Sequence, residues 1–380
     1  MSENISGGRK LLVVSDTTMQ YKGNQLLAFE PVVRELDSIS MLFDHIVWLG
    51  YHNPHKKTSL SIPHSSNITM IPMPPSGSKG MMGKMKIILF YPVYLFYILK
   101  NLKGVTHIHS RAPSHPAMIV MWLSKWMNKI ICWHKYAGNW SEPSPSGSYA
   151  FQRNLLRNIH KPNVYGTING SWPGQEKHLL SFENPCLFES ELREAFAVGN
   201  AKDFTGKLNL LFVGNLSAFK GIIQLVDALE LLTNADRFEH LYIAGDGILK
   251  EELLSRAKQQ TKVKIFVMGS LPRAELLKLY SKAHINILPS ASEGFPKVIA
   301  EGAAYGCLPM VTDVSSIGQY IIDGENGFLL KDNKPETIAF ALEKISSHTQ
   351  LENLCKSVLT LCPKFTYEYF NKRIQKHFLS

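Results

Sequence analysis

The sequence lacks the paired cysteines that a disulfide framework requires. Five cysteines occur in 380 residues, none in a C-x-x-C pair, and an odd number cannot pair completely within one chain. No long low-complexity tract is present, and 45% hydrophobic and 19% charged residues are ordinary for a folded protein. These absences exclude a disulfide scaffold and a disordered chain, and they favour a reducing compartment such as the cytoplasm.

A run long enough to cross a membrane is missing as well. The longest apolar stretch, Ile87–Leu99, is interrupted by Pro92, and a spanning helix needs about 20 apolar residues. Met1–Arg9 has no apolar core of a signal peptide, so we expect a cytoplasmic protein. Lysines flank the apolar stretch, which is typical of a helix lying on an anionic membrane, here the inner face of the cell membrane. A buried helix with solvated ends is the alternative.

The sequence has fewer acidic than basic residues. Lysine and arginine total 41 against 31 aspartates and glutamates, a net charge of +10, which favours anionic partners. The basic residues are scattered and accompany no nucleic-acid-reading motif, so nucleic acid is not an expected partner. His107 and His109 have the spacing that strand alternation gives, without a third ligand nearby, so we expect no metal. Gly245–Gly247 lacks the third glycine of a dinucleotide fingerprint, so we expect no bound cofactor.

Short apolar runs alternate with helical segments in both halves of the chain. Leu11–Asp16 and Leu208–Val213 are typical of buried parallel strands that open each half. The alternation predicts an α/β fold with two Rossmann-like, doubly wound domains facing across a cleft, where ligands bind at strand carboxyl ends. The expected boundaries are a first domain at 1–185, a linker at 186–206, a second domain at 207–362, and a C-terminal helix at 363–380 that packs back on the first domain.

Two carboxylates bracket a strand-to-helix junction in the second half. Glu293 precedes the expected helix, Pro296 suits its first position, and Glu301 lies on its second turn. Free N–H groups at the helix start, approached through Gly294 without a Cβ, can receive an anion such as a diphosphate. The carboxylates can accept hydrogen bonds from sugar or ribose hydroxyls. A turn residue and a solvated helix carboxylate are the alternative.

A lysine is presented in a similar way upstream. The strand Leu210–Val213 leads into Gly214 and Asn215, and Lys220–Gly221 then enters a helix. One ammonium held at the end of a strand can face phosphate groups. A plain surface lysine is the alternative.

Together these segments resemble the carboxyl-terminal half of the retaining family-4 glycosyltransferases, the glycosyl transferases group 1 of GT-B fold. The resemblance runs from Val213 to Leu330 and includes Ile243–Gly247, Gly269–Pro272 and Asp323–Phe328. It implies that Lys220 holds the donor diphosphate, Glu293 meets the donor sugar and Glu301 binds ribose hydroxyls. The remaining donor-binding residues that it implies are Gly214, Asn215, Gly269, Leu271, Gly294, Phe295 and Pro296.

One departure concerns the residue after the first glycine. The family often has arginine there, and this sequence has Asn215. Neutralisation of the diphosphate would then depend on Lys220, on the helix start at Pro296, or on a basic residue of the first domain such as Lys22 or Arg111.

The first half resembles the family less closely. Gly23 is kept in the loop expected after the first strand. Many relatives place a histidine near the reacting sugar after the strand that corresponds to Ile130–Trp133, which makes His134 a catalytic candidate beside Lys220 and Glu293. A structural strand histidine is the alternative. The expected cleft residues of this domain are Gly23, Arg111, Lys135 and Asn139.

The resemblance implies transfer of a sugar from a nucleoside-diphosphate donor to an acceptor hydroxyl, with retention and without an essential metal. The first domain would bind the acceptor, a glycan or lipid-linked sugar, and the second the nucleotide sugar. Bacterial cell-envelope polysaccharide or lipopolysaccharide biosynthesis is the expected pathway. A nucleotide-sugar epimerase of the same fold and a non-catalytic nucleotide-sugar-binding module are the alternatives.

Overall fold

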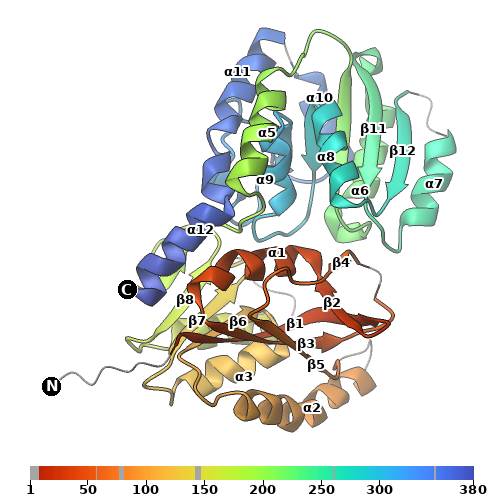
Figure 1. The fold of residues 1–380 in the computed structure, drawn as a ribbon. Coiled ribbons are helices and arrows are strands. Elements are labelled where there is room, and N and C mark those ends of the chain that lie inside the picture. The colour runs from red at the N-terminus through yellow and green to blue at the C-terminus, as the bar shows by residue number, and fades with distance from the viewer. Residues whose placement is uncertain (1–7, 57, 77–80, 142–146, 260–261, 346–347) are drawn as a thin grey trace. The chain divides into compact units, whose positions relative to one another are not determined.

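The computed structural model describes residues 8–56, 58–76, 81–141, 147–259, 262–345 and 348–380. The chain divides into two units, each an α/β domain with a mostly parallel sheet (Figure 1). Unit 1 comprises Met1–Phe182 and Asn371–Ser380, and unit 2 comprises Glu183–Phe370. The predicted pair of doubly wound α/β domains is therefore confirmed.

The described part of unit 1 is built on a nine-stranded sheet. Its central strand β1 pairs in parallel with β3 and β6, and its buried run Leu11–Ser15 explains the continuous apolar sequence of a strand covered on both faces. The strands are β1 Lys10–Lys22, β2 Gln25–Phe29, β3 His45–His52, β4 Leu60–Ser61, β5 Ile68–Met73, β6 His107–Ala112, β7 Ile131–Tyr136, β8 Val164–Ile168 and β9 Leu179–Ser181.

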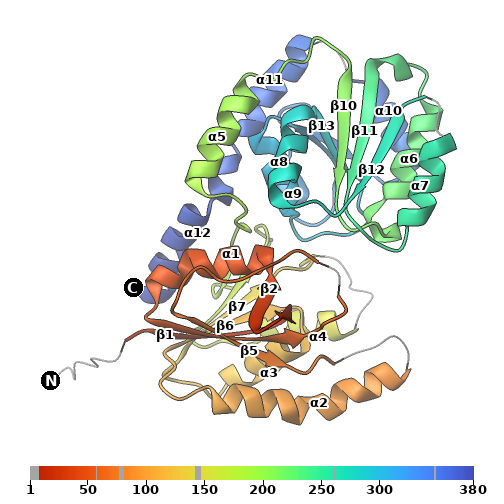
Figure 2. The same cartoon turned by 45° about the vertical axis from the view of Figure 1, so that its right-hand side comes forward.

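Helices cover both faces of this sheet. Helix α1, Glu30–Ile39, lies on one face, and α2, Met81–Lys100, and α3, His115–Ser124, lie together on the other (Figures 1 and 2). Helix α4 spans Gly147–Arg157 and contacts α3. Among the described residues no helix is long and apolar enough to cross a membrane.

The end of the chain is an amphipathic helix. Helix α12, Tyr367–Ile374, begins after Thr366, whose Oγ1 accepts a hydrogen bond from the N–H of Tyr369 at 3.2 Å. The ring of Phe378 stacks on Trp133 of β7 at 5.0 Å between centroids. Residues from Asn371 onward belong to unit 1, so the division falls inside this helix and not at residue 363.

Unit 2 holds a parallel sheet of six strands in the order β12-β11-β10-β13-β14-β15 within its described residues. The order reverses between β10 and β13, as in the dinucleotide-binding α/β folds, and such a reversal opens a crevice at the carboxyl ends of the two strands. The strands are β10 Leu208–Val213, β11 Phe238–Ala244, β12 Lys264–Gly269, β13 Ile285–Leu288, β14 Leu308–Thr312 and β15 Phe328–Leu330. The helices are α5 Glu189–Asn200, α6 Ile222–Leu231, α7 Lys250–Gln259, α8 Arg273–Lys282, α9 Lys297–Ala304, α10 Pro335–Glu343 and α11 His348–Leu359.

The linker expected at 186–206 is wrong. Most of it is helix α5, which packs on α9 and α11 as part of unit 2. Leu192 and Ala195 are buried, and the side chain of Glu191 accepts a hydrogen bond from the N–H of Phe188 at 2.8 Å, which fixes the helix start. The apolar stripe of this helix is short and its outer face is charged, so the sequence pattern is that of a polar connection.

Candidate functional site

The site begins where the order of the unit 2 strands reverses. β10 and β13 are adjacent and parallel, with Leu210 opposite Ile285, so the loops that follow them leave the sheet at the same edge. The two loops are joined directly, because the N–H of Ala291 donates to the carbonyl of Phe219 at 2.8 Å. Segments some 70 residues apart are thereby held side by side at the crevice that this topology creates.

Lys220 and Glu293 meet where these two loops leave the sheet. The Lys220 ammonium forms a hydrogen-bonded ion pair with Glu293 Oε1. The lysine side chain is 26% exposed and the glutamate 11%, so the pair is accessible from one side and sheltered on the other. An ammonium has three donors, so it can hold the carboxylate and a phosphate oxygen together. The structure thus combines a cation suited to a phosphate with a carboxylate suited to a hydroxyl.

Gly221 allows the loop after β10, which carries Lys220, to approach the loop after β13, which carries Glu293. Its φ is 69°, in the left-handed region, and a Cβ there would stand 2.0 Å from the carbonyl oxygen of Pro289. Only glycine fits both the backbone conformation and the close approach. The Lys220–Gly221 dipeptide in the sequence therefore reflects a steric requirement of the site as well as a charge.

Gly221→Ala is expected to lower the free energy of unfolding by at least about 2 kcal/mol, because one loop must move to relieve the contact. The melting temperature of the purified chain measures this effect. Gly206→Ala is the matched control, since a Cβ at Gly206 meets nothing within 4 Å. Equal melting temperatures for the two variants would contradict the close packing of the loops.

Three glycines of the motifs that resemble the family terminate neighbouring strands. The N–H of Gly214 donates to Ala244 at 3.0 Å, and the N–H of Gly245 donates to Gly269 at 2.8 Å, so the ends of β10, β11 and β12 are linked. Exposed Asn215 donates from its side chain to the carbonyl of Asp246 at 3.2 Å. Its amide thus braces the turn and contributes no positive charge where the family often has arginine. Leu271 is half-buried just beyond Gly269.

Glu301 is placed differently from Glu293. It is buried on α9, where Oε1 accepts from Arg273 at 3.1 Å and Oε2 from the hydroxyl of Tyr280 at 3.2 Å. Burial, followed by the charge of Glu301, raises the pKa of Tyr280, so this hydroxyl stays a donor. Arg273 also binds Glu191, which ties α5, α8 and α9 together. Ribose hydroxyls would have to share these carboxylate oxygens, and this role stays a prediction. Sequence reasoning missed Arg273 and Tyr280, since their shared helix carries no motif.

The start of α9 follows the expected pattern with one shift. The helix begins at Lys297 and Pro296 is its cap, one residue later than predicted. The carbonyl of Gly294 accepts from the Ser316 hydroxyl at 3.2 Å. Phe295 is buried and its ring stacks on Phe365 at 4.7 Å, so its side chain belongs to the core. A donor-binding role for Phe295 is therefore limited to its backbone.

The catalytic role expected of His134 is corrected to a structural one. His134 lies on β7 and is fully buried, with Nδ1 2.7 Å from Ser110 Oγ and Nε2 3.3 Å from Ser124 Oγ. Burial lowers its pKa to about 3, so the ring stays neutral at physiological pH. Strand alternation directs its side chain to the face opposite that of its neighbours Trp133 and Lys135, which sequence reasoning did not resolve.

The other expected residues of the first domain divide into two groups. Gly23 is the turn of the hairpin between β1 and β2, because β1 continues to Lys22 and the loop expected from Asp16 is strand. Asn139 braces its own turn through a hydrogen bond from the N–H of Ser141 at 3.1 Å. In contrast, Arg111 and Lys135 are cross-strand neighbours on β6 and β7 and both bind Glu35 of α1. Glu35, 76 residues before Arg111, carried no signal in the sequence.

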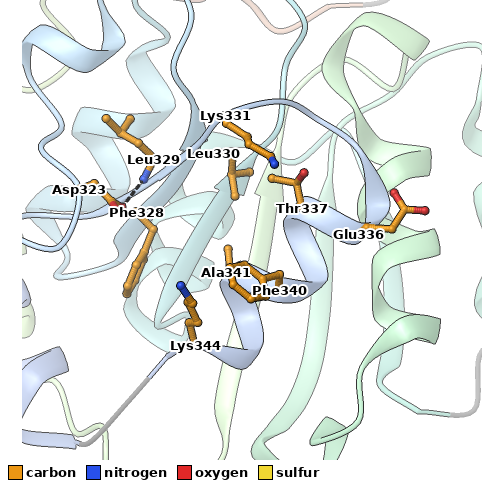
Figure 3. Close-up of a pocket in the computed structure, with 10 residues that line it drawn as sticks. All are labelled: Asp323, Phe328, Leu329, Leu330, Lys331, Glu336, Thr337, Phe340, Ala341 and Lys344. Carbon is orange, nitrogen blue, oxygen red and sulfur yellow. Dashed lines mark hydrogen bonds between the residues drawn. The ribbon is translucent and has the colours of Figure 1, made fainter.

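A hollow of about 580 Å³ lies elsewhere on unit 2, between β15 and α10 (Figure 3). Phe328, Phe340 and Lys344 line it, and none of the predicted site residues does. The predicted site residues therefore lie outside this hollow. Among the described residues no group of three or more His, Cys, Asp and Glu could hold a metal ion.

Comparison with known proteins agrees with this geometry. Residues 199–357 match the family described as "Glycosyl transferases group 1". The chain carries a glycosyl transferases group 1 domain. This domain contains Lys220 and Glu293. Glycogen synthase of Mycobacterium tuberculosis (strain ATCC 25618 / H37Rv) is 32% identical over 124 residues, which are 32% of this chain and 30% of the relative. An uncharacterized glycosyltransferase of Methanocaldococcus jannaschii, MJ1178, is 29% identical over 159 residues, 42% of this chain and 44% of the relative. The chain thus spans less than half the length of these curated relatives.

Solved structures extend the likeness to both units. Sucrose-phosphate synthase from Thermosynechococcus elongatus superposes with a TM-score of 0.69 at 17% identity, covering 97% of this chain and 98% of that protein. Anabaena Alr3699/HepE in complex with UDP-glucose gives 0.64 at 14% identity, covering 97% and 98%. At these identities the likeness establishes the fold. The chain therefore has the predicted GT-B fold, and residues 199–357 are the part of it that matches the glycosyltransferase family.

Proposed function

We propose that this chain transfers a sugar from a nucleoside-diphosphate donor to an acceptor hydroxyl. The observation that carries the proposal is the Lys220–Glu293 pair at the strand-order reversal of the glycosyltransferase domain. The description of the HepE neighbour as a complex with UDP-glucose supports a nucleotide sugar as the donor. The glycosyltransferase relatives support transfer as the reaction.

The chemistry follows from where charge develops. As the bond to the donor sugar breaks, negative charge accumulates on the leaving diphosphate, and a fixed ammonium beside it stabilises the transition state. Lys220 supplies that ammonium, and the backbone N–H groups at the start of α9 add to it. Glu293 accepts hydrogen bonds from the donor sugar hydroxyls and orients the sugar. Retention of configuration and independence from an essential metal are parts of this proposal.

Two measurements test the proposal together. Thermal shift with UDP, GDP, ADP and CDP should show stabilisation by one of them, which identifies the donor base. The matching nucleotide sugars are then incubated with and without acceptors. Release of the nucleoside diphosphate only when an acceptor is present supports transfer. Turnover of UDP-N-acetylglucosamine without an acceptor would indicate an epimerase, and binding without turnover of any donor would indicate a binding module.

We also propose a lipid-linked acceptor, reached at an anionic membrane, in cell-envelope polysaccharide or lipopolysaccharide assembly. The supporting feature is the α2–α3 surface, defined by exposed Leu89, Phe96 and Leu99 of α2 and Trp122 and Trp126 at the end of α3. The two tryptophan rings touch at 4.4 Å between centroids. Monomeric proteins rarely leave such large apolar groups together in water.

The charges around the α2–α3 surface fit an anionic membrane. Lys100, Lys103, Lys125 and Lys129 are exposed close to it in sequence. Residues 45–141, which include both helices, contain no aspartate or glutamate. Lysines flanking apolar and aromatic side chains without any acid favour binding to anionic lipid.

The double variant Trp122→Ser/Trp126→Ser is expected to weaken binding to anionic liposomes at least about tenfold, because two large apolar groups no longer enter the lipid interface. Flotation at low salt measures the bound fraction. Phe340→Ser is the matched control, since Phe340 is 58% exposed on unit 2. Wild-type chain that fails to float with anionic liposomes would remove this part of the proposal.

A further inference from the structure

A second hollow, of about 350 Å³, lies in unit 1 beside the middle of β1, at Asp16–Thr18, and at the carboxyl ends of β6 and β7. Its charged lining comprises Lys56, Arg111 and Lys135 against one carboxylate, Asp16, among the described residues. Thr17, Thr18 and Thr58 add hydroxyl groups. Strand carboxyl ends are where parallel α/β domains bind ligands, and this volume falls in the range of small-molecule sites.

Arg111 and Lys135 form a cationic wall of this hollow, and a buried carboxylate holds them in place. Glu35 is 1% exposed, and its Oε1 accepts from Arg111 Nη1 at 2.5 Å and from Lys135 Nζ at 2.9 Å. Because Arg111 and Lys135 are register partners on adjacent strands, both reach Glu35 from the same face of the sheet. The buried position of Glu35 fixes the guanidinium plane and prevents it from folding away into solvent.

Arg111 keeps donors for a ligand. A guanidinium has five N–H groups; Arg111 uses Nη1 for Glu35 and His109, and one N–H of Nη2 for Glu35. This leaves donors on Nε and Nη2. Burial lowers the pKa of His109 well below its usual value, so that ring adds no charge to the wall. Exposed Lys56 lines the same hollow from the loop after β3.

From this arrangement we propose that the hollow binds the oxyanion of an anionic sugar, the phosphate or carboxylate that the acceptor's sugar carries, whether that sugar is free or lipid-linked. The oxyanion contacts Arg111 and Lys56. Asp16 and the threonines accept and donate hydrogen bonds to the ligand hydroxyls, which an inorganic anion would lack. The acceptor role rests on the proposed transfer function, whereas binding of the oxyanion does not.

The sequence shows why this wall stays cationic. Residues 45–141 supply Lys56, Arg111 and Lys135 and contain no aspartate or glutamate. The carboxylates at the hollow, Asp16 and Glu35, both come from the preceding segment, and one of them is buried beneath the wall.

Ligand binding without donor tests this proposal separately from transfer. Glucose 6-phosphate, glucuronate and glucose are titrated into the full-length chain and followed by ligand-observed NMR. Lys220→Ala is used as a second background, so that anion binding at the donor site is subtracted. We expect both anionic sugars, or one of them, to bind at least about tenfold more tightly than glucose, with a Kd on the order of 1 mM. Preference for one arm identifies phosphate or carboxylate as the group bound.

Lys56→Gln should weaken binding of the preferred anion about tenfold, since it removes one charge-assisted contact from an exposed position that the fold does not need. Arg111→Gln should weaken it further while Lys135 keeps its pair with Glu35. Lys177→Gln, an exposed lysine of unit 1 outside the hollow, should leave binding unchanged. Equal affinities for wild type, Lys56→Gln and Arg111→Gln would overturn the proposal, as would a wild-type chain that does not distinguish the anions from glucose. Oxyanion binding without any sugar transfer would refute the proposed function and leave this site standing.

Discussion

Lys220→Ala is expected to lower kcat/KM for sugar transfer by about 10²–10³-fold while the chain stays folded. The ammonium is paired with Glu293, and in the proposed mechanism it is the cation beside the leaving diphosphate. Losing it removes stabilisation of charge that develops in the transition state, so kcat should fall along with affinity for the nucleoside diphosphate. Initial rates with the donor identified by thermal shift measure the change.

Lys278→Ala is the control for this variant. Lys278 forms an ion pair with Glu275 at 2.8 Å, but both side chains are largely exposed on α8. Pairs of that kind contribute little to stability, so activity and melting temperature should match wild type. Full transfer activity in Lys220→Ala would exclude the role assigned to Lys220.

Glu293→Gln is expected to separate binding from catalysis. The amide keeps the shape of the side chain but loses the charge that pairs with Lys220. Without this competitor the ammonium is free for the diphosphate, so nucleoside-diphosphate affinity should stay equal or rise. Transfer should fall by about 10²-fold or more, because the donor sugar loses its orienting carboxylate.

Steady-state kinetics and calorimetric titration with the nucleoside diphosphate measure the two effects of Glu293→Gln. Glu275→Gln, which neutralises a glutamate paired with lysine on the same unit, should change neither. A parallel loss of binding and transfer would show that Glu293 supports the fold of the loop, and unchanged transfer would show that it does not meet the sugar.

The sequence predicted that the loops after β10 and β13 lie at one edge, because the carboxyl ends of parallel strands in one sheet share an edge. Runs such as Leu208–Val213 and Ile285–Leu288 are apolar apart from one asparagine each, so they are predicted to be buried strands, and the polar residues that follow them gather at one edge. The strand pattern places Lys220 and Glu293 after strands of one sheet, and the resemblance to the family implies that they share one site. Glycines at the strand ends pointed to the same edge.

The errors arose where tertiary contacts decide the outcome. His134 could be placed on a strand, but the face that it takes depends on the register of that strand against helices. Glu35 binds residues 76 and 100 positions away, and no local pattern announces such a contact. Glu301 has the expected spacing from Glu293, yet the packing of α8 against α9 gives its carboxylate to Arg273 and Tyr280.

A structure of the chain with a bound nucleoside diphosphate tests the central claim most directly. The account predicts a diphosphate oxygen at hydrogen-bonding distance from Lys220 Nζ, about 2.7–3.2 Å, at the loop ends of β10 and β13. A diphosphate bound elsewhere, with Lys220 still held by Glu293 alone, would contradict it.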